Sequence, residues 1–407
     1  MRIAGHPPML GADGDAFLAS LRAEPVWHGE SSMSPRPFRI DVSQAVLTDL
    51  HHRLDATRFP EPLPGAPWER GADVSYVREL CAYWRHQYDW RRHEAELNRY
   101  PQFLCEVDGI DVHFWHVRGK GPSPLPLLLT HGWPGSIHDF HHLIGPLTDP
   151  AAHGGDAADA FDVVIPALPG YGFSGKPREP GWSATRVAAA FDRLMAEHLG
   201  YVRYGAQGGD WGGIVSTMLG VNHPEHLVGI HLNMAFAGPP PGEEQSELAR
   251  AYGQKVAALM ATESGYFQVQ STKPMSLAIA HSDSPAGLAA WIVEKFQTWS
   301  DVRSKDWLLT NLMFYWVTNS AASAANLYYE THGMGRLDQS SPVRVPTAVA
   351  VFPKELPMAP RRWLEARYDL RRYTEMARGS HFAAVDAPEL LLEDVRAFFR
   401  ELRQARR

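Results

Sequence analysis

A glycine-rich stretch at residues 205–213, with the sequence GAQGGDWGG, constrains the fold of this chain more than any other segment. The preceding residues, 199–204, read as a short strand, and residues 214–219 read as the start of a helix. A strand that turns into a helix within a few residues needs backbone freedom, which the glycines flanking Asp210 supply. Residues 208–212 have the G-x-S-x-G spacing of a nucleophile elbow, with aspartate in the place of serine.

Aspartate at the centre of an elbow predicts a different reaction from serine. A carboxyl group with its ordinary pKa of about 3.9 is ionised near neutral pH. The carboxylate can attack an sp³ carbon directly and leave an alkyl ester on the protein. Aspartate is also among the most favourable helix N-caps, and Asp210 stands where a cap belongs. The stretch alone therefore leaves two interpretations open, a nucleophile and a cap.

Composition and charge exclude several classes of partner. The 407 residues are 44% hydrophobic, enough for a large core. The formal net charge is −7, and the most basic stretch is the C-terminal tail, so we expect no nucleic-acid partner. Apolar runs are too short for a membrane span and the N-terminus lacks the apolar region of a secretory signal, so we expect no membrane partner and a cytoplasmic location. Cys81 and Cys105 have neither CxxC nor zinc-type spacing, which predicts inert thiols and no metal site.

Apolar strand-like segments alternate with helical segments over the middle of the chain. The clearest strands are 125–130, 161–166 and 226–232, and the spacing between them fits helical connections. Such alternation predicts an α/β fold with a mostly parallel central sheet that is flanked by helices on both faces. The alternation stops after Phe236 and strand character returns only at Val345. We expect the intervening helical, aromatic-rich segment to be a cap over the carboxyl edge of the sheet, where ligand sites of α/β folds lie.

These patterns divide the chain into five predicted parts. They are a loose N-terminal arm (1–34), a helical N-terminal segment that ends in a hairpin with an Asp-Gly turn (35–120), a first core part (121–236), a helical cap or lid (237–337) and a second core part (338–407).

A nucleophilic Asp210 needs an acid and a histidine later in the chain, each after a strand. His381 lies in the loop GSHFAA, just past the last predicted strand, 371–376. Glu355 directly follows the penultimate predicted strand, 345–352. In this interpretation Glu355 orients the imidazole of His381, which takes a proton from water. Three other acids are alternatives to Glu355: Asp338, Asp369 and Asp386, the last of which looks like a helix cap.

Hydrolysis of an ester on Asp210 also needs donors for the oxyanion that forms. The backbone N–H groups of Trp133, in the turn HGWPGS, and of Trp211, after the nucleophile, are the predicted pair. A cis Trp133–Pro134 bond would fix the first of these turns. Taken alone, the turn at 131–136 is also compatible with an ordinary strand end.

With these residues in view, the chain resembles the microsomal-type epoxide hydrolases, including soluble bacterial and fungal members, in the α/β-hydrolase superfamily. The resemblance runs from about Pro37 to the end and departs from the family in Gly213 and Ser380, both small residues that put little in doubt. Its motifs are HGWPGS (131–136), PGYGFSGKP (169–177), GGDWG (208–212), FPKEL (352–356) and GSHFAA (379–384).

The resemblance implies an α/β-hydrolase fold and hydrolysis of a hydrophobic epoxide by water to a vicinal diol, through a covalent aspartyl ester. It implies no cofactor, and family habit suggests a homodimer. It also implies two cap tyrosines as ring-opening acids, Tyr266 in ESGY and Tyr328 in NLYYE, with the adjacent Tyr329 as the alternative if the match slips by one residue. Residues 1–34 lack the character of the membrane anchor that vertebrate members carry, so a soluble protein is expected.

Two other functions stay open at this point. A haloalkane dehalogenase also uses an aspartate elbow followed by tryptophan, but binds a halide and needs no tyrosine pair. A non-catalytic ligand receptor of the same fold would be expected to lack part of the triad. Neither the identity of the epoxide nor a role in detoxification as against secondary metabolism follows from the residues.

Overall fold

The computed structural model describes residues 34–302, 304–333 and 339–404. Residues 34–407 form one compact unit. The predicted arm at 1–34, apart from Ser34, lies outside the described residues, as does Asp338. The five boundaries proposed from the sequence stay predictions.

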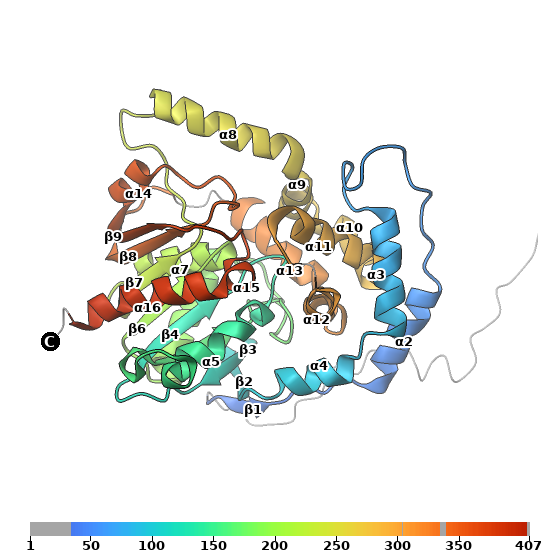
Figure 1. Cartoon of the computed structure of the whole chain (residues 1–407), viewed down its shortest axis with the longest axis horizontal. Coiled ribbons are helices and arrows are strands. Elements are labelled where there is room, and N and C mark those ends of the chain that lie inside the picture. The colour runs from blue at the N-terminus through green and yellow to red at the C-terminus, as the bar shows by residue number, and fades with distance from the viewer. Residues whose placement is uncertain (1–33, 303, 334–338, 405–407) are drawn as a thin grey trace, which may run out of the picture. The chain divides into compact units, whose positions relative to one another are not determined.

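A nine-stranded sheet runs through this unit (Figure 1). The pairings from β1 to β5 in the order below are antiparallel, and those from β5 to β9 are parallel, so the predicted mostly parallel α/β sheet is confirmed. The strands lie side by side in the order β1 (Arg36–Phe38), β2 (Gln102–Val107), β3 (Ile110–Val117), β5 (Phe161–Pro166), β4 (Leu125–Thr130), β6 (Tyr204–Gly208), β7 (Leu227–Leu232), β8 (Val343–Val351) and β9 (Tyr368–Glu375).

Helices cover both faces of the sheet. Successive residues of a strand point to opposite faces, so two adjacent residues of β6 show which helices lie on each face. The Tyr204 hydroxyl donates to Asp192 of α6 (Ala184–Arg193) at 2.7 Å. A Cβ on the next residue, Gly205, would instead lie 2.5 Å from Phe399 of α16 (Pro388–Gln404). On the α6 side lies α7 (Trp211–Asn222), and on the α16 side lies α5 (His141–Thr148).

The strand expected at 199–204 is wrong, because β6 begins only at Tyr204 and continues through Gly208. Residues 194–198 form a wide helical turn and Gly200 has a φ of 73°, so the chain is still turning there. Glycine is required within this strand because the neighbouring atoms leave no room for side chains. A Cβ on Gly208 would lie 2.3 Å from the backbone of Gly212.

The N-terminal segment contributes α2 (Gln44–Asp55), α3 (Val74–His86) and α4 (Trp90–Leu97). Each of these helices begins after a residue whose side chain accepts a hydrogen bond from the first turn: Ser43, Asp73 and Asp89. Figure 1 shows these helices beside the cap, where α3 packs against α11 and α12. The N-terminal segment therefore supports the cap as well as the sheet.

The cap lies between β7 and β8 in the sequence and is helical, as expected. Its helices are α8 (Glu247–Glu263), α9 (Gly265–Thr272), α10 (Pro274–Asp283), α11 (Pro285–Trp299), α12 (Lys305–Trp316) and α13 (Ala321–Tyr328). Shorter elements complete the fold: the helices α14 (Arg361–Arg367) and α15 (Ala383–Asp386), and the turns η1 (Ile137–Phe140), η2 (Pro150–His153), η3 (Ala157–Asp159), η4 (Leu194–His198) and η5 (Tyr329–Gly333). In the described part of the chain, no helix has the length and apolar character that crossing a bilayer requires.

Candidate active site

Asp210 occupies the sharp turn between β6 and α7. Its φ of 50° and ψ of −128° are unusual for a residue with a side chain, a strain that is typical of functional sites. Its side chain has a hydrogen bond from the N–H of Trp211, the first residue of α7, but makes no helix-capping hydrogen bond, so the helix-cap interpretation lacks its defining contact. Small neighbours are required here, because a Cβ on Gly132 would lie 2.3 Å from Asp210 Oδ1 and one on Gly212 would lie 1.8 Å from the Thr130 carbonyl oxygen.

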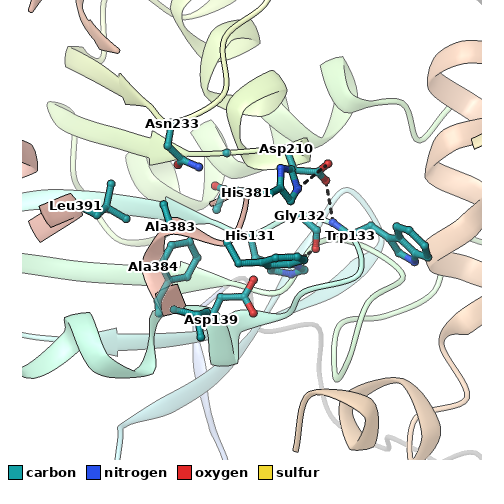
Figure 2. A pocket seen from close by; sticks show the side chains of 15 residues that line it. His131, Gly132, Trp133, Asp139, Asp210, Asn233, His381, Ala383, Ala384 and Leu391 are labelled. Atoms are coloured by element: carbon teal, nitrogen blue, oxygen red, sulfur yellow. Dashed lines mark hydrogen bonds and ion pairs between the residues drawn. The ribbon is translucent and has the colours of Figure 1, made fainter. Parts of the chain in front are cut away.

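The two backbone donors expected at an oxyanion hole meet at the Asp210 carboxylate. The N–H of Trp133 donates to Asp210 Oδ1 at 2.8 Å, and the Trp133–Pro134 peptide is cis, as expected (Figure 2). Burial raises the pKa of Asp210, while the charge of His381 and hydrogen bonds from the N–H groups of Trp133 and Trp211 oppose the increase. The carboxylate thus has one oxygen held by the backbone and the other, Oδ2, on the side of His381.

His381 lies between Asp210 and Glu355. Its Nδ1 is 2.6 Å from Glu355 Oε1, and its Nε2 is 3.6 Å from Asp210 Oδ2. Both partners of the shorter contact have side chains that are 2% exposed. Burial lowers the pKa of His381, but the charges of Glu355 and Asp210 outweigh burial and raise that pKa to about 9. The imidazole is therefore oriented by one carboxylate and faces the other.

The loops that carry His381 and Glu355 are joined by their backbones. The N–H of Lys354 donates to the carbonyl of Gly379 at 3.2 Å, next to a bridge between Lys354 and Ser380. The alternative acids that the structure describes are engaged elsewhere. Asp369 pairs with Arg371 at 2.8 Å, and Asp386 accepts hydrogen bonds from Ser300 and Ser380.

Two cap tyrosines lie against the tryptophans of the turn and the elbow. The ring of Tyr266, on α9, stacks on Trp133 with centroids 4.9 Å apart, and Tyr328, at the end of α13, meets Trp211 edge to face at 4.6 Å. The two phenol rings are 5.9 Å apart. Burial and the charge of Asp210 raise the pKa of both phenols. Tyr329 is 37% exposed whereas Tyr328 is 3% exposed, so burial beside Trp211 favours Tyr328 over its neighbour.

Comparison with known proteins gives the family. A model of the epoxide hydrolase N terminus matches residues 35–140, and a model of the alpha/beta hydrolase fold matches residues 126–330. A protein of Stigmatella aurantiaca named "Putative epoxide hydrolase" is 46% identical over 382 residues, which span 90% of this chain and 85% of that one. Epoxide hydrolase 1 of Oryctolagus cuniculus is 37% identical, with 93% of each chain covered. The chain belongs to the epoxide hydrolases.

Solved structures agree with this assignment to the epoxide hydrolases. The crystal structure of juvenile hormone epoxide hydrolase from Bombyx mori superposes with a TM-score of 0.83 at 32% identity, covering 93% of this chain and 96% of that one. The epoxide hydrolase of Aspergillus niger gives 0.81 at 30% identity, with 91% and 97% covered. The predicted family and the predicted α/β-hydrolase fold are both confirmed, and the dehalogenase alternative is not favoured.

A small cavity of this epoxide hydrolase, lined by both polar and apolar side chains, lies beside the nucleophile. Its volume is about 40 Å³, which is room for water, and Asp210, His381, Asp139 and Asn233 all line it (Figure 2). Thr130 Oγ1 also lines the cavity and is buried with no hydrogen-bond partner among the described residues. The cavity therefore offers a site for water beside both the carboxylate and the imidazole.

Sequence reasoning missed Asp139 and Asn233. Asp139 follows the turn HGWPGS, where its backbone contact with Ser136 resembles an ordinary capping box. Burial raises the pKa of Asp139 to about 8. Asn233 directly follows β7, and that position was its one available signal. In the described ranges, no group of three or more His, Cys, Asp or Glu side chains could hold a metal ion.

Proposed function

We propose that this epoxide hydrolase opens its substrate with Asp210 and hydrolyses the resulting ester with His381 and Glu355, giving a vicinal diol. The observation that carries the proposal is the state of the Asp210 carboxylate. One oxygen accepts from the Trp133 N–H at 2.8 Å, and the other lies 3.6 Å from His381 Nε2, too far for a hydrogen bond. An oxygen on the side of His381, held at a strained turn, suits attack on a ring carbon.

In ring opening, a bond forms between Asp210 Oδ2 and a ring carbon while the bond from that carbon to the epoxide oxygen breaks. The leaving oxygen takes a proton from the phenol of Tyr266 or Tyr328. An alkoxide is a far stronger base, with a conjugate acid of pKa about 15.7 as in water, than a phenolate at about 10. Because the charge of Asp210 raises the pKa of both phenols, consuming that charge makes them stronger acids as the attack proceeds.

In ester hydrolysis, His381 takes a proton from water, and the oxygen of that water attacks the carbonyl carbon of the ester. The negative charge develops on the oxygen that faces the N–H groups of Trp133 and Trp211. Collapse releases the diol, whose new hydroxyl takes the proton from His381. The regenerated carboxyl group of Asp210 then loses the proton that the phenolate regains through solvent, which closes the cycle.

The two steps are electrically coupled in this scheme. The charge of Asp210 is one of the causes that raise the pKa of His381 to about 9. An ester carries no charge, so that pKa falls once Asp210 is alkylated. The imidazole therefore loses its proton more readily, and is better able to act as a base, at the stage when a base is required.

The substrate class follows from the surroundings of the tyrosines. Trp133, Trp211 and Phe267 lie against Tyr266 or Tyr328, which supports a hydrophobic epoxide. The homodimer, the cytoplasmic location and the absence of a nucleic-acid partner stay predictions. An alkyl halide that is turned over when no epoxide is would favour the dehalogenase alternative, and saturable binding without any turnover would favour a receptor.

A single turnover in H₂¹⁸O with enzyme in excess over styrene oxide tests the mechanism. The new oxygen of the first diol comes from Asp210, so the diol should be unlabelled and the peptide with Asp210 should gain one ¹⁸O. A labelled diol with an unlabelled peptide would mean that water attacks the ring directly. The His381→Gln variant provides the complementary measurement, because the intact epoxide should accumulate as an adduct on the same peptide.

A further inference from the structure

A buried lysine of the cap, Lys295 on α11, lies next to the proposed acid Tyr266. Lys295 is 6% exposed. Its Nζ lies 5.2 Å from the ring centroid of Tyr266 and 5.0 Å from that of Trp299, over both rings. The ring of Trp299 in turn meets His381 edge to face at 5.4 Å. The ammonium group thus lies over the ring of Tyr266, the proposed acid, and the single ring of Trp299 separates it from His381.

Two carboxylates hold the ammonium group in place. Lys295 Nζ lies 2.9 Å from Glu263 Oε2 and 2.7 Å from Glu294 Oε2. Glu263 is the last residue of α8, and Tyr266 follows on α9 after a short connection. The pair with Glu263 therefore ties α11 to the segment that carries the phenol, whereas Glu294 lies on α11 itself, and together the two carboxylates fix the cation over the phenol ring.

The charges of this cluster act on the phenol in opposite directions. A cation over an aromatic face is attracted by the ring, and more strongly when water is excluded. A phenolate would attract it further, because the ring then carries a full negative charge. The carboxylates have the reverse effect. Burial first, then the charge of Asp210 and, less strongly, those of Glu263 and Glu294 raise the pKa of Tyr266.

We propose that Lys295 is a positioning residue for ring opening, which holds the ring of Tyr266 on Trp133 and offsets the two glutamates while the phenol gives up its proton. This inference rests on the proposed role of Tyr266. The O–H bond of the phenol breaks, the proton moves to the epoxide oxygen, and the electron pair stays on the phenolate next to the ammonium group. Lys295 itself exchanges no proton and forms no bond with the substrate.

Rapid-quench single turnovers with styrene oxide test this inference, with mass spectrometry following formation and decay of the Asp210 adduct. Lys295→Met keeps the length of the side chain and removes its charge. We expect ring opening to slow about tenfold and ester decay to change by less than about twofold. Lys295→Arg should restore most of the rate. The matched control is Lys305→Met, since Lys305 also pairs with a glutamate, Glu79, and lies 5.3 Å from the Tyr83 ring, but on the side of the N-terminal segment.

A double-mutant cycle separates this role from a purely structural one. In the Tyr266→Phe background, Lys295→Met should slow ring opening by less than about twofold, because the phenol through which Lys295 acts is absent. Equal slowing in both backgrounds, or equal slowing of ring opening and ester decay, would overturn the inference. If Tyr266→Phe alone leaves ring opening unchanged, the proposed acid role of Tyr266 is wrong and the inference falls with it. A slow Tyr266→Phe variant beside an unaffected Lys295→Met variant would overturn the inference alone.

A charge-neutral cluster covers the case in which Lys295→Met does not fold. The triple variant Glu263→Gln, Glu294→Gln, Lys295→Met removes the cation and both carboxylates together, so no buried charge is left unpaired. If Lys295 assists ring opening, the triple variant should open the ring more slowly than the unmodified enzyme, while its ester decay changes by less than about twofold. A triple variant whose ring opening is unchanged would overturn the inference.

Discussion

The carboxylate of Glu355 lies 2.6 Å from His381 Nδ1 through Oε1, while its other oxygen, Oε2, is buried without a hydrogen-bond partner among the described residues. A buried carboxylate with only part of its bonding capacity used is costly, and such costs are typical of active sites. Oε1 also accepts a hydrogen bond from the N–H of Leu356 at 2.7 Å, so both of these contacts involve the oxygen that faces His381.

Glu355→Gln should therefore impair ester hydrolysis far more than ring opening. The substitution keeps the shape of the side chain but removes the charge that raises the pKa of His381. We expect ester decay to slow by about 10²–10⁴-fold, the range of general-base assistance. Adduct formation should stay within a few-fold of the unmodified enzyme in the same rapid-quench experiment. Equal slowing of both steps would contradict the assignment of Glu355 to the second step alone.

The pH dependence of ester hydrolysis should reveal the coupling between Asp210 and His381. Burial lowers the pKa of His381 in the free enzyme, and Glu355 and Asp210 raise it to about 9. In the ester, the contribution of Asp210 is absent, so the pKa must be lower. Because neutral imidazole is the base, ester decay should rise with pH and level off above an apparent pKa below 9. An NMR titration of His381 in the free enzyme gives the comparison, and an identical pKa in both states would contradict the coupling.

Adjacent tyrosines offer a matched pair of variants. Tyr328→Phe removes a buried phenol beside Trp211, whereas Tyr329→Phe removes a phenol on a side chain that is 37% exposed. We expect ring opening to slow by about 10- to 100-fold in the first variant, less than the loss of a lone general acid, because Tyr266 remains. The second variant should stay within about twofold. The reverse order would mean that the family match slips by one residue.

Asp139→Asn should reduce the loss of stability that occurs as pH rises from about 4 to 8. Burial raises the pKa of Asp139 from 3.8 to about 8. Its contribution to stability is therefore complete below pH about 4 and is lost as pH rises through 8, since the unfolded chain ionises more readily. Asparagine cannot ionise, so the free energy of unfolding of the variant relative to the unmodified enzyme should increase between pH 4 and 9 by at least about 1.4 kcal/mol, the value of one pKa unit.

Urea unfolding at several pH values measures the effect of Asp139→Asn, with Asp156→Asn as its control. Asp156 is an exposed aspartate whose side chain also accepts a hydrogen bond from a nearby backbone N–H, so it matches Asp139 in this respect but not in burial. A free-energy difference for Asp139→Asn that stays constant with pH would contradict the raised pKa.

Local signals in the sequence were sufficient for the parts of the site that follow strands. Asp210, Glu355 and His381 lie in the loops that follow β6, β8 and β9, and the carboxyl ends of parallel strands meet at one edge of a sheet. Glycine was the misleading signal. The glycines were interpreted as providing backbone freedom for a turn. Gly205 and Gly208 instead lie within β6, where the neighbouring backbone and side chains approach too closely for any side chain.

Residues whose role depends on distant contacts could not be predicted. Asp139 reads as a cap until the fold brings it to the cavity beside Asp210. Lys295 reads as one charge on a cap helix, because its partner Glu263 lies 32 residues earlier and the ring it covers belongs to another helix. No spacing rule within one element links such pairs.

The cap lies in a single interval of the chain, between β7 and β8, and it supplies both tyrosines, whereas the nucleophile, the backbone donors, the histidine and its acid all come from the sheet and its loops. The residues that donate the proton in ring opening and the residues that hydrolyse the ester therefore come from different segments of the chain. An exchanged or diversified cap can alter which epoxide is accepted and which ring carbon is attacked, because those choices are made before the ester exists. The residues that hydrolyse the ester would stay unchanged, so a library confined to this one interval, with Tyr266, Tyr328 and Lys295 kept, searches selectivity while the second step is preserved.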